Sequence, residues 1–184
     1  MREVFGDIWE YPADYICITT NGGVRKDGAA VMGRGVALQA KQRFPGIEFI
    51  LGRSILEYGN IFRMLTVEEK GLFIFPVKYH WRERADLTLI EKSTTDLRRA
   101  AELRPGRTFV LPRPGCGNGR LLWEQVKPVL ERVGLPDNVH VIDRPRIQEL
   151  RTEAKFKDAK AISGIFDITG GLDASEYVRR MRDA

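Results

Sequence analysis

The sequence predicts an α/β domain in which a mixed sheet lies between two layers of helices. Short runs of apolar and β-branched residues alternate along the chain with segments of helical periodicity. Two of the strand-like runs end in glycine-rich turns that lead into helices. With 184 residues, 43% of them hydrophobic, the chain is long enough to bury a substantial core. We place one domain at residues 1–143 and treat residues 144–184 as a C-terminal extension.

The first half of the domain is predicted to supply four strands and one helix. Strands are expected at 2–8 and 15–20, followed by a helix over 35–44 that Pro45-Gly46 ends. Apolar residues line one face of that helix: Val36, Ala37, Ala40 and Phe44. The runs 61–66 and 72–76 flank a turn that ends in glycine, so they are expected to pair as a hairpin.

The second half is predicted to continue with helix, strand, helix and strand. A helix over 86–103 is followed by a strand at 107–112, a helix over 122–133 and a last strand at 139–143. The apolar face of the first of these helices consists of Leu87, Ile90, Thr94, Leu97 and Ala101. In the extension, apolar stripes such as Tyr177, Val178 and Met181 predict helices that pack on the domain or on a partner subunit.

The two glycine-rich turns, at 21–36 and 115–119, carry the strongest functional signal. Glycine permits positive φ and removes Cβ atoms, so that backbone N–H groups at a helix start can surround a phosphate. Either turn alone could equally be a plain tight turn. Two such turns at the carboxyl ends of strands can face each other across a crevice, which suits a diphosphate. Their spacing matches neither the dinucleotide fingerprint nor the P-loop.

Charge and composition narrow the class of partner. The formal net charge is +5, and residues 78–113 hold nine Lys or Arg against five Asp or Glu. Within this region Lys78-Tyr79-His80-Trp81-Arg82 interleaves cations with aromatics, which suits nucleic acid, although a solvated basic surface has the same composition. The two histidines and two cysteines are far apart and suggest neither a metal site nor a disulfide framework, and no cofactor is implied. We expect a cytoplasmic protein with no membrane partner.

Four segments in order resemble the macrodomain family, an ADP-ribose-binding three-layer α/β/α fold. They are Val4–Ile8, Thr20-Asn21 with Val31–Gln39, Phe75–Arg82, and Pro114–Gly119 with Leu122-Trp123. The resemblance is to the branch that contains terminal ADP-ribose protein glycohydrolase and the antitoxin macrodomain that removes ADP-ribose from DNA. It covers residues 3–143 and implies a macrodomain with a mixed central sheet, to which residues 144–184 would add a helical extension.

The resemblance implies a set of ligand-binding residues. Asp7 would accept a hydrogen bond from the adenine amine beside the Ile8 N–H, although an Asp here could instead cap a turn. Asn21 would meet the distal ribose. The two loops would enclose the diphosphate, the first through Met32, Gly33, Gly35 and Val36, and the second through Gly115, Cys116, Gly117, Asn118 and Gly119.

Lys78 is the candidate catalytic residue, as a nucleophile or an electrostatic partner at the anomeric carbon of the distal ribose. To attack, its pKa must be lowered by desolvation or by cations such as Arg82; the alternative is an ordinary solvated lysine. His80 lies on the same face as Lys78 only if the strand continues past residue 78. Only then could it act as a general acid or base. A catalytic thiol at Cys116 lacks an evident histidine partner.

Two departures from the resembled pattern matter. The second loop has Asn118 where terminal ADP-ribose protein glycohydrolase has an aspartate, so the glutamate-ester reaction is not expected, and the DNA-directed antitoxin is the better comparison. The first loop carries an insertion at 22–30 whose charges would reach a substrate or keep the loop soluble.

These residues predict an enzyme, an ADP-ribosylglycohydrolase that binds ADP-ribose and removes it from a nucleic acid base or a protein. Two other functions use the same crevice. One is a module that binds ADP-ribose without turnover, and the other is a phosphatase or deacetylase that acts on free ADP-ribose derivatives. Lys78 discriminates among them, because the hydrolase should need it and the binding module should not.

Overall fold

A computed structural model describes residues 1–67 and 70–144, within a compact unit that spans Met1–Arg144. The predictions for residues 145–184 lie outside the described residues. The strands are β1 (Arg2–Phe5), β2 (Tyr15–Asn21), β3 (Arg63–Val67), β4 (Lys70–Lys78), β5 (Phe109–Pro112) and β6 (Val139–Asp143). The helices are α1 (Gly35–Arg43), α2 (Ile47–Tyr58), α3 (Leu87–Glu102) and α4 (Trp123–Val133), with a 3-10 turn, η1, at Gly117–Gly119.

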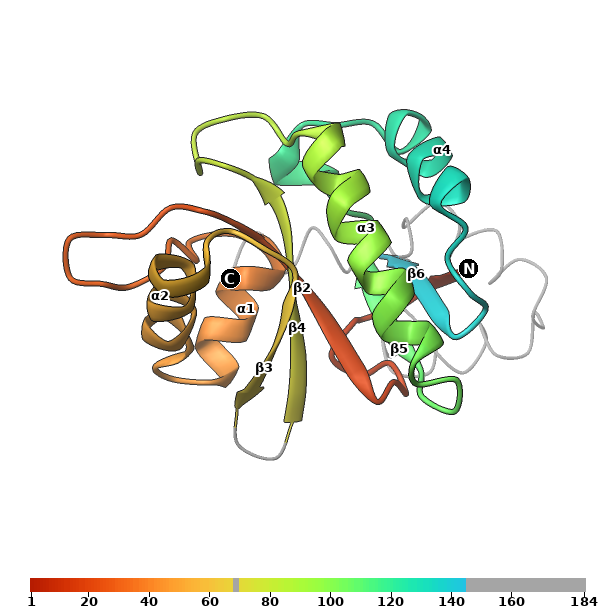
Figure 1. Cartoon of the computed structure of the whole chain (residues 1–184), viewed down its shortest axis with the longest axis horizontal. Helices are drawn as coiled ribbons and strands as arrows, with labels where there is room; N and C mark the ends of the chain where they lie inside the picture. Colours follow the sequence, from red (N-terminus) through yellow and green to blue (C-terminus); the bar gives the residue numbers. More distant parts are fainter. Residues whose placement is uncertain (68–69, 145–184) are drawn as a thin grey trace, which may run out of the picture. The chain divides into compact units, whose positions relative to one another are not determined.

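The strands form a mixed sheet in the order β1-β6-β5-β2-β4-β3. β3 runs antiparallel to β4, as the predicted hairpin requires, and the other neighbours are parallel. Helices α1 and α2 lie on one side of the sheet, and α3 and α4 lie on the other (Figure 1). The α/β prediction with a mixed central sheet is therefore confirmed.

Side chains alternate between two cores along each central strand. In β4, Phe73, Phe75 and Val77 pack against α3 and α4, whereas Leu72 and Ile74 pack against α1 and α2. Strands β2, β5 and β6 divide in the same way between the two faces. This period of two explains why the strands read as continuous apolar runs: both faces are covered by helices.

Three local expectations differ from the structure. The first strand ends at Phe5 rather than at residue 8, because Gly6 has φ +150° and the chain then turns. Residues 47–58, for which no element was predicted, form α2. The glycine-rich turn at 115–119 does not enter a helix directly, since η1 and the exposed N-cap Leu122 precede α4.

Candidate functional site

The carboxyl ends of β2, β4 and β5 place three of the predicted site segments at one end of the sheet. Asn21 and Lys78 are register partners in the parallel pair of β2 and β4. The register shifts between Thr20 and Asn21, because Thr20 pairs with Pro76 and leaves Val77 as an extra residue of β4. The second loop follows β5 and rises at the same end of the sheet (Figure 1).

The first loop is organised by the side chain of Asn21. Its amide nitrogen donates to the Val31 carbonyl at 2.9 Å, and its oxygen accepts from the Gly23 N–H at 2.9 Å. These bonds join the two ends of the insertion, so the amide predicted to meet the ribose also holds the loop. The Met32 side chain is buried among the side chains of the α1 and α2 core, and a contact of Met32 with the ligand stays a prediction.

The two glycine loops meet. Gly35 has φ +60°, and a Cβ built on it would lie 3.4 Å from the Asn118 side-chain nitrogen. In the second loop Gly115 and Gly117 also have positive φ, and a Cβ on Gly117 would meet nothing within 4 Å. The two loops therefore approach each other at these glycines, and their binding of a diphosphate stays a prediction.

Lys78 lies between these loops and is nearly buried, with 9% of its surface exposed. Its ammonium nitrogen donates to the Asn118 carbonyl oxygen at 2.7 Å. Burial lowers the pKa of Lys78, and the nearby cations Arg120 and Arg34 lower this pKa further. In the described part of the chain Lys78 forms no ion pair.

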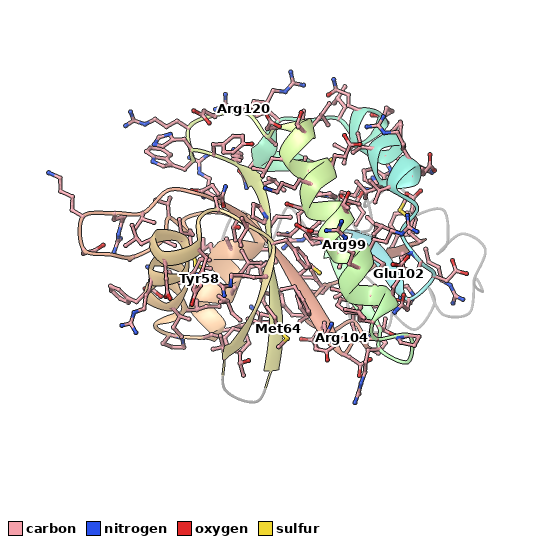
Figure 2. All side chains as sticks on the ribbon, in the orientation of Figure 1. Tyr58, Met64, Arg99, Glu102, Arg104 and Arg120 are labelled. Atoms are coloured by element: carbon pink, nitrogen blue, oxygen red, sulfur yellow. The ribbon has the colours of Figure 1, made fainter. Side chains whose placement is uncertain are left out.

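The cations that lower the pKa of Lys78 are Arg120 and Arg34, and not Arg82 as expected. Arg82 instead places its guanidinium over the Trp81 ring, 4.6 Å from the ring centroid. Arg34 precedes α1 in the first loop, and Arg120 follows η1 in the second, so each loop supplies one cation. Arg120 has φ 62°, which is unusual for a residue other than glycine, and Figure 2 labels it at the same end of the molecule.

Asp7 lies two residues beyond the end of β1 and caps a turn. Its Oδ1 accepts from the Trp9 N–H at 2.8 Å, and its carbonyl accepts from the Glu10 N–H at 3.2 Å. Ile8 is buried in the α1 and α2 core. The turn-capping alternative is thus observed, and the predicted contact of Asp7 with adenine stays a prediction.

His80 and Cys116 gain no support as reacting groups. Strand β4 ends at Lys78, so the condition for His80 to share its face is not met. The exposed His80 ring accepts from the Arg82 N–H at 3.3 Å. Burial raises the pKa of Cys116 to about 11, which keeps this thiol protonated at neutral pH.

The insertion at 22–30 closes on itself and on α2. Arg25 pairs with Asp27 inside the loop, and the Ala30 N–H donates to the Glu48 carbonyl at 2.8 Å. A Cβ on Gly52 of α2 would overlap the Gly28 carbonyl, so this helix and the loop are in close contact. Two of the three charges considered for substrate contact therefore neutralise each other.

Three residues at the site were assigned no role from the sequence. Arg34 lies inside one of the segments that resemble the family and Arg120 directly follows another, but their proximity to Lys78 depends on how the loops fold. Thr20 is buried at the end of β2, and its hydroxyl has no hydrogen-bond partner among the described residues. A polar residue at the end of an apolar strand was the available signal for Thr20.

Other parts of the described chain offer no competing centre. Residues 1–67 and 70–144 contain no cluster of three metal-binding side chains. None of the helices described here has the length and apolar character needed to span a bilayer. A surface cavity of about 370 Å³ is lined by Met1, Glu3 and Lys127 among others, at the opposite end of β1 from the site.

Comparisons with known proteins identify relatives of one kind. No family model matches the chain. A protein of Thermus aquaticus named DNA ADP-ribosyl glycohydrolase is 32% identical over 190 residues, which covers 94% of this chain and 51% of that protein. The chain thus spans about half the length of this curated relative. The aligned 94% of the chain is more than residues 1–144 make up, so the sequence similarity also extends into the C-terminal extension.

Solved structures agree with the curated relative. The macrodomain of Mycobacterium tuberculosis DarG superposes with a TM-score of 0.63 and 29% identity, over 79% of this chain and 97% of that one. Thermosipho africanus DarTG in complex with ADP-ribose superposes with a TM-score of 0.63 at 20% identity, over 78% of this chain and 41% of that chain. The second comparison speaks for the fold alone.

Proposed function

We propose that this chain, a DarG-like macrodomain, binds ADP-ribose and removes it hydrolytically from modified DNA. The fold and the DarG-like character rest on the comparisons above. Both the DNA target and the ADP-ribose group are inferred from the name of the curated relative, DNA ADP-ribosyl glycohydrolase. A DNA target would also be consistent with the cytoplasmic location expected from the sequence.

The observation that carries the proposed hydrolysis is the environment of Lys78. Lys78 is nearly buried between the two loops, and its burial and two nearby cations lower its pKa, which favours the neutral amine. A neutral amine can attack the anomeric carbon of the distal ribose while the base departs with the bonding electrons and takes up a proton. Water then displaces the lysine nitrogen and releases ADP-ribose.

The remaining contacts follow from the loop geometry. The backbone N–H groups around Gly35 and Gly117 would bind the diphosphate, and Arg34 and Arg120 add positive charge beside it. The hydrogen bond from Lys78 to the Asn118 carbonyl positions the amine without placing a negative charge beside it. A carboxylate at the same place would favour the charged lysine, which cannot attack.

The test compares Lys78→Ala and Lys78→Arg with the unchanged protein on ADP-ribosylated DNA and ADP-ribosylated protein offered side by side. Lys78→Ala should lower turnover by several orders of magnitude, while affinity for free ADP-ribose, measured by calorimetry, changes by less than about tenfold, or about 1.4 kcal/mol. Lys92→Ala is the matched control, since Lys92 is an exposed lysine on α3.

The outcomes separate the functions that share this crevice. Unchanged turnover in Lys78→Ala would contradict the mechanism, and tight ADP-ribose binding with no turnover of either substrate would identify a binding module. Full activity of Lys78→Arg would leave only an electrostatic role, because arginine keeps its charge and does not become a nucleophile. Faster release of ADP-ribose from protein than from DNA would indicate that proteins are the substrate.

A further inference from the structure

We propose that Tyr79 and Trp81 form a stacking platform for the unpaired DNA bases that flank the modified nucleotide. This inference rests on the proposed function for its ligand, and its test separates the two. The platform is the segment 79–83, which directly follows Lys78 at the end of β4. Nothing in the contacts of Lys78 with the two loops requires these aromatic side chains.

Both rings are exposed where burial would be expected for aromatic residues. Tyr79 is 58% exposed and Trp81 is 46% exposed, although each lies within three residues of the nearly buried Lys78. The apolar residues that precede them in β4, from Leu72 to Val77, are all buried. The chain therefore changes from core to open aromatic surface at the candidate catalytic lysine.

The platform is held in place by its own hydrogen bonds. The His80 N–H donates to the Glu83 carboxylate at 3.1 Å, and the Glu83 N–H donates to the His80 carbonyl at 3.1 Å. The Trp81 ring edge lies against the first loop, since a Cβ on Gly23 would be 3.3 Å from its Cδ1 atom. These contacts fix the main chain of the segment and the Trp81 ring before binding, so little conformational entropy is lost when a base stacks on Trp81.

Charge and access favour a single strand of nucleic acid as the occupant. Arg82 stacks on the Trp81 ring and offers its guanidinium to a phosphate. The carboxylate of Glu83, the acidic residue within the platform, is bound to the His80 N–H. Because Lys78 is nearly buried, a base attached to the ribose must leave its duplex partner to reach it. The neighbouring bases of an unpaired strand then have free faces that can stack on the rings.

The molecule offers a matched control in a second exposed aromatic residue with an arginine over its ring. Tyr58, at the end of α2, is 52% exposed, and the guanidinium carbon of Arg63 lies 3.9 Å from its ring centroid. Figure 2 labels Tyr58 beside α2, away from the end of the sheet where Arg120 is labelled. Tyr58 and Trp81 are thus both exposed and both have an arginine over the ring, but only Trp81 is close to Lys78 in the chain.

The experiment measures binding of an unmodified, fluorescently labelled 12-nucleotide single strand by anisotropy at low salt. The double variant Tyr79→Ala/Trp81→Ala should bind the strand at least tenfold more weakly, while Tyr58→Ala binds it like the unchanged protein. A duplex of the same sequence should bind more weakly than the single strand. Thermal unfolding of each variant should match the unchanged protein, because all three side chains are exposed.

A second measurement ties the platform to turnover. The double variant should raise KM for an ADP-ribosylated oligonucleotide at least tenfold and leave hydrolysis of a single ADP-ribosylated nucleotide unchanged. Equal strand affinity in the double variant, no strand binding by the unchanged protein, or equal binding of duplex would overturn the platform. A defect confined to ADP-ribosylated protein would overturn it in favour of a protein partner. The binding experiment uses an unmodified strand and does not depend on turnover. It therefore tests the platform even if the protein hydrolyses no ADP-ribosylated substrate.

Discussion

Gly115 in the second loop and Gly33 in the first loop differ in what a side chain at each position would meet. In the second loop a Cβ on Gly115 would lie 2.8 Å from Ile90 and 2.9 Å from Leu121, so this glycine is required by packing in addition to its φ of +74°. In the first loop Gly33 has open space around it and no positive φ. Glycine content alone therefore does not identify the positions that face a ligand.

Among the glycine substitutions, the largest effect is expected for Gly115→Ala. The added methyl group meets three side chains within 3.0 Å, and alanine is strained at this positive φ, so we expect a loss of about 3 kcal/mol in the free energy of unfolding. Urea denaturation measures it. A loss below about 1 kcal/mol would show that the core around Ile90 adapts easily and would remove the contrast between the loops.

Gly117→Val tests the open side of the second loop. Its Cβ would enter the space in which the diphosphate is proposed to lie, and valine disfavours the φ of +68°. We expect affinity for ADP-ribose to fall at least tenfold, or about 1.4 kcal/mol, by calorimetry. Normal binding by a folded variant would reduce the second loop to a tight turn.

The paired arginines test whether the loops contribute equally to the pKa of Lys78. Arg120→Gln should raise this pKa more than Arg34→Gln, because Arg120 has the larger effect of the two cations. If the neutral amine reacts, the rising limb of kcat against pH moves to higher pH in both variants, and further in Arg120→Gln. Equal shifts would show that the loops are electrostatically equivalent, and opposite shifts would contradict the role assigned to the cations.

The lowered pKa of Lys78 also determines whether its contribution to the stability of the protein rises or falls with pH. Between the folded pKa of Lys78 and its unfolded value the unfolded chain binds more protons, so the contribution of this group to stability rises with pH across that window.

The smallest effect is expected for Gly33→Ala. With open space around the Cβ and no positive φ, the free energy of unfolding should change by less than about 0.5 kcal/mol in the same urea experiment. ADP-ribose affinity is the sensitive measurement here, because a methyl group in open space is felt only if a ligand occupies it. A large stability loss would contradict the packing contrast with Gly115.

Most of the fold could be predicted from periodicity, and α2 shows where periodicity fails. The central strands can be predicted because helices cover both faces of the sheet, so each strand is a continuous apolar run in the sequence. Helix α2 begins directly after Pro45-Gly46 and carries Gly52 in its interior, both of which indicate a loop in a sequence. Gly52 is there because the Gly28 carbonyl approaches the helix, a contact between distant segments that local patterns do not contain.

The candidate site shows a similar division. The position of Lys78 followed from its place after an apolar strand, but its neighbours did not. Arg82 is closer to Lys78 in sequence, yet Arg120 and Arg34 act on it because two loops fold toward the same point. Which cations surround a buried amine is a property of the assembled loops.

The hydrogen bond from Lys78 to Asn118 uses a main-chain carbonyl as its acceptor. Every amino acid carries that carbonyl, so substitution at position 118 leaves the acceptor in place as long as the turn persists, whereas position 78 depends on one side chain. Substitutions at these two contacting residues therefore differ in their consequence for this hydrogen bond. A change of side chain at 118 keeps the acceptor, whereas a change at 78 removes the donor.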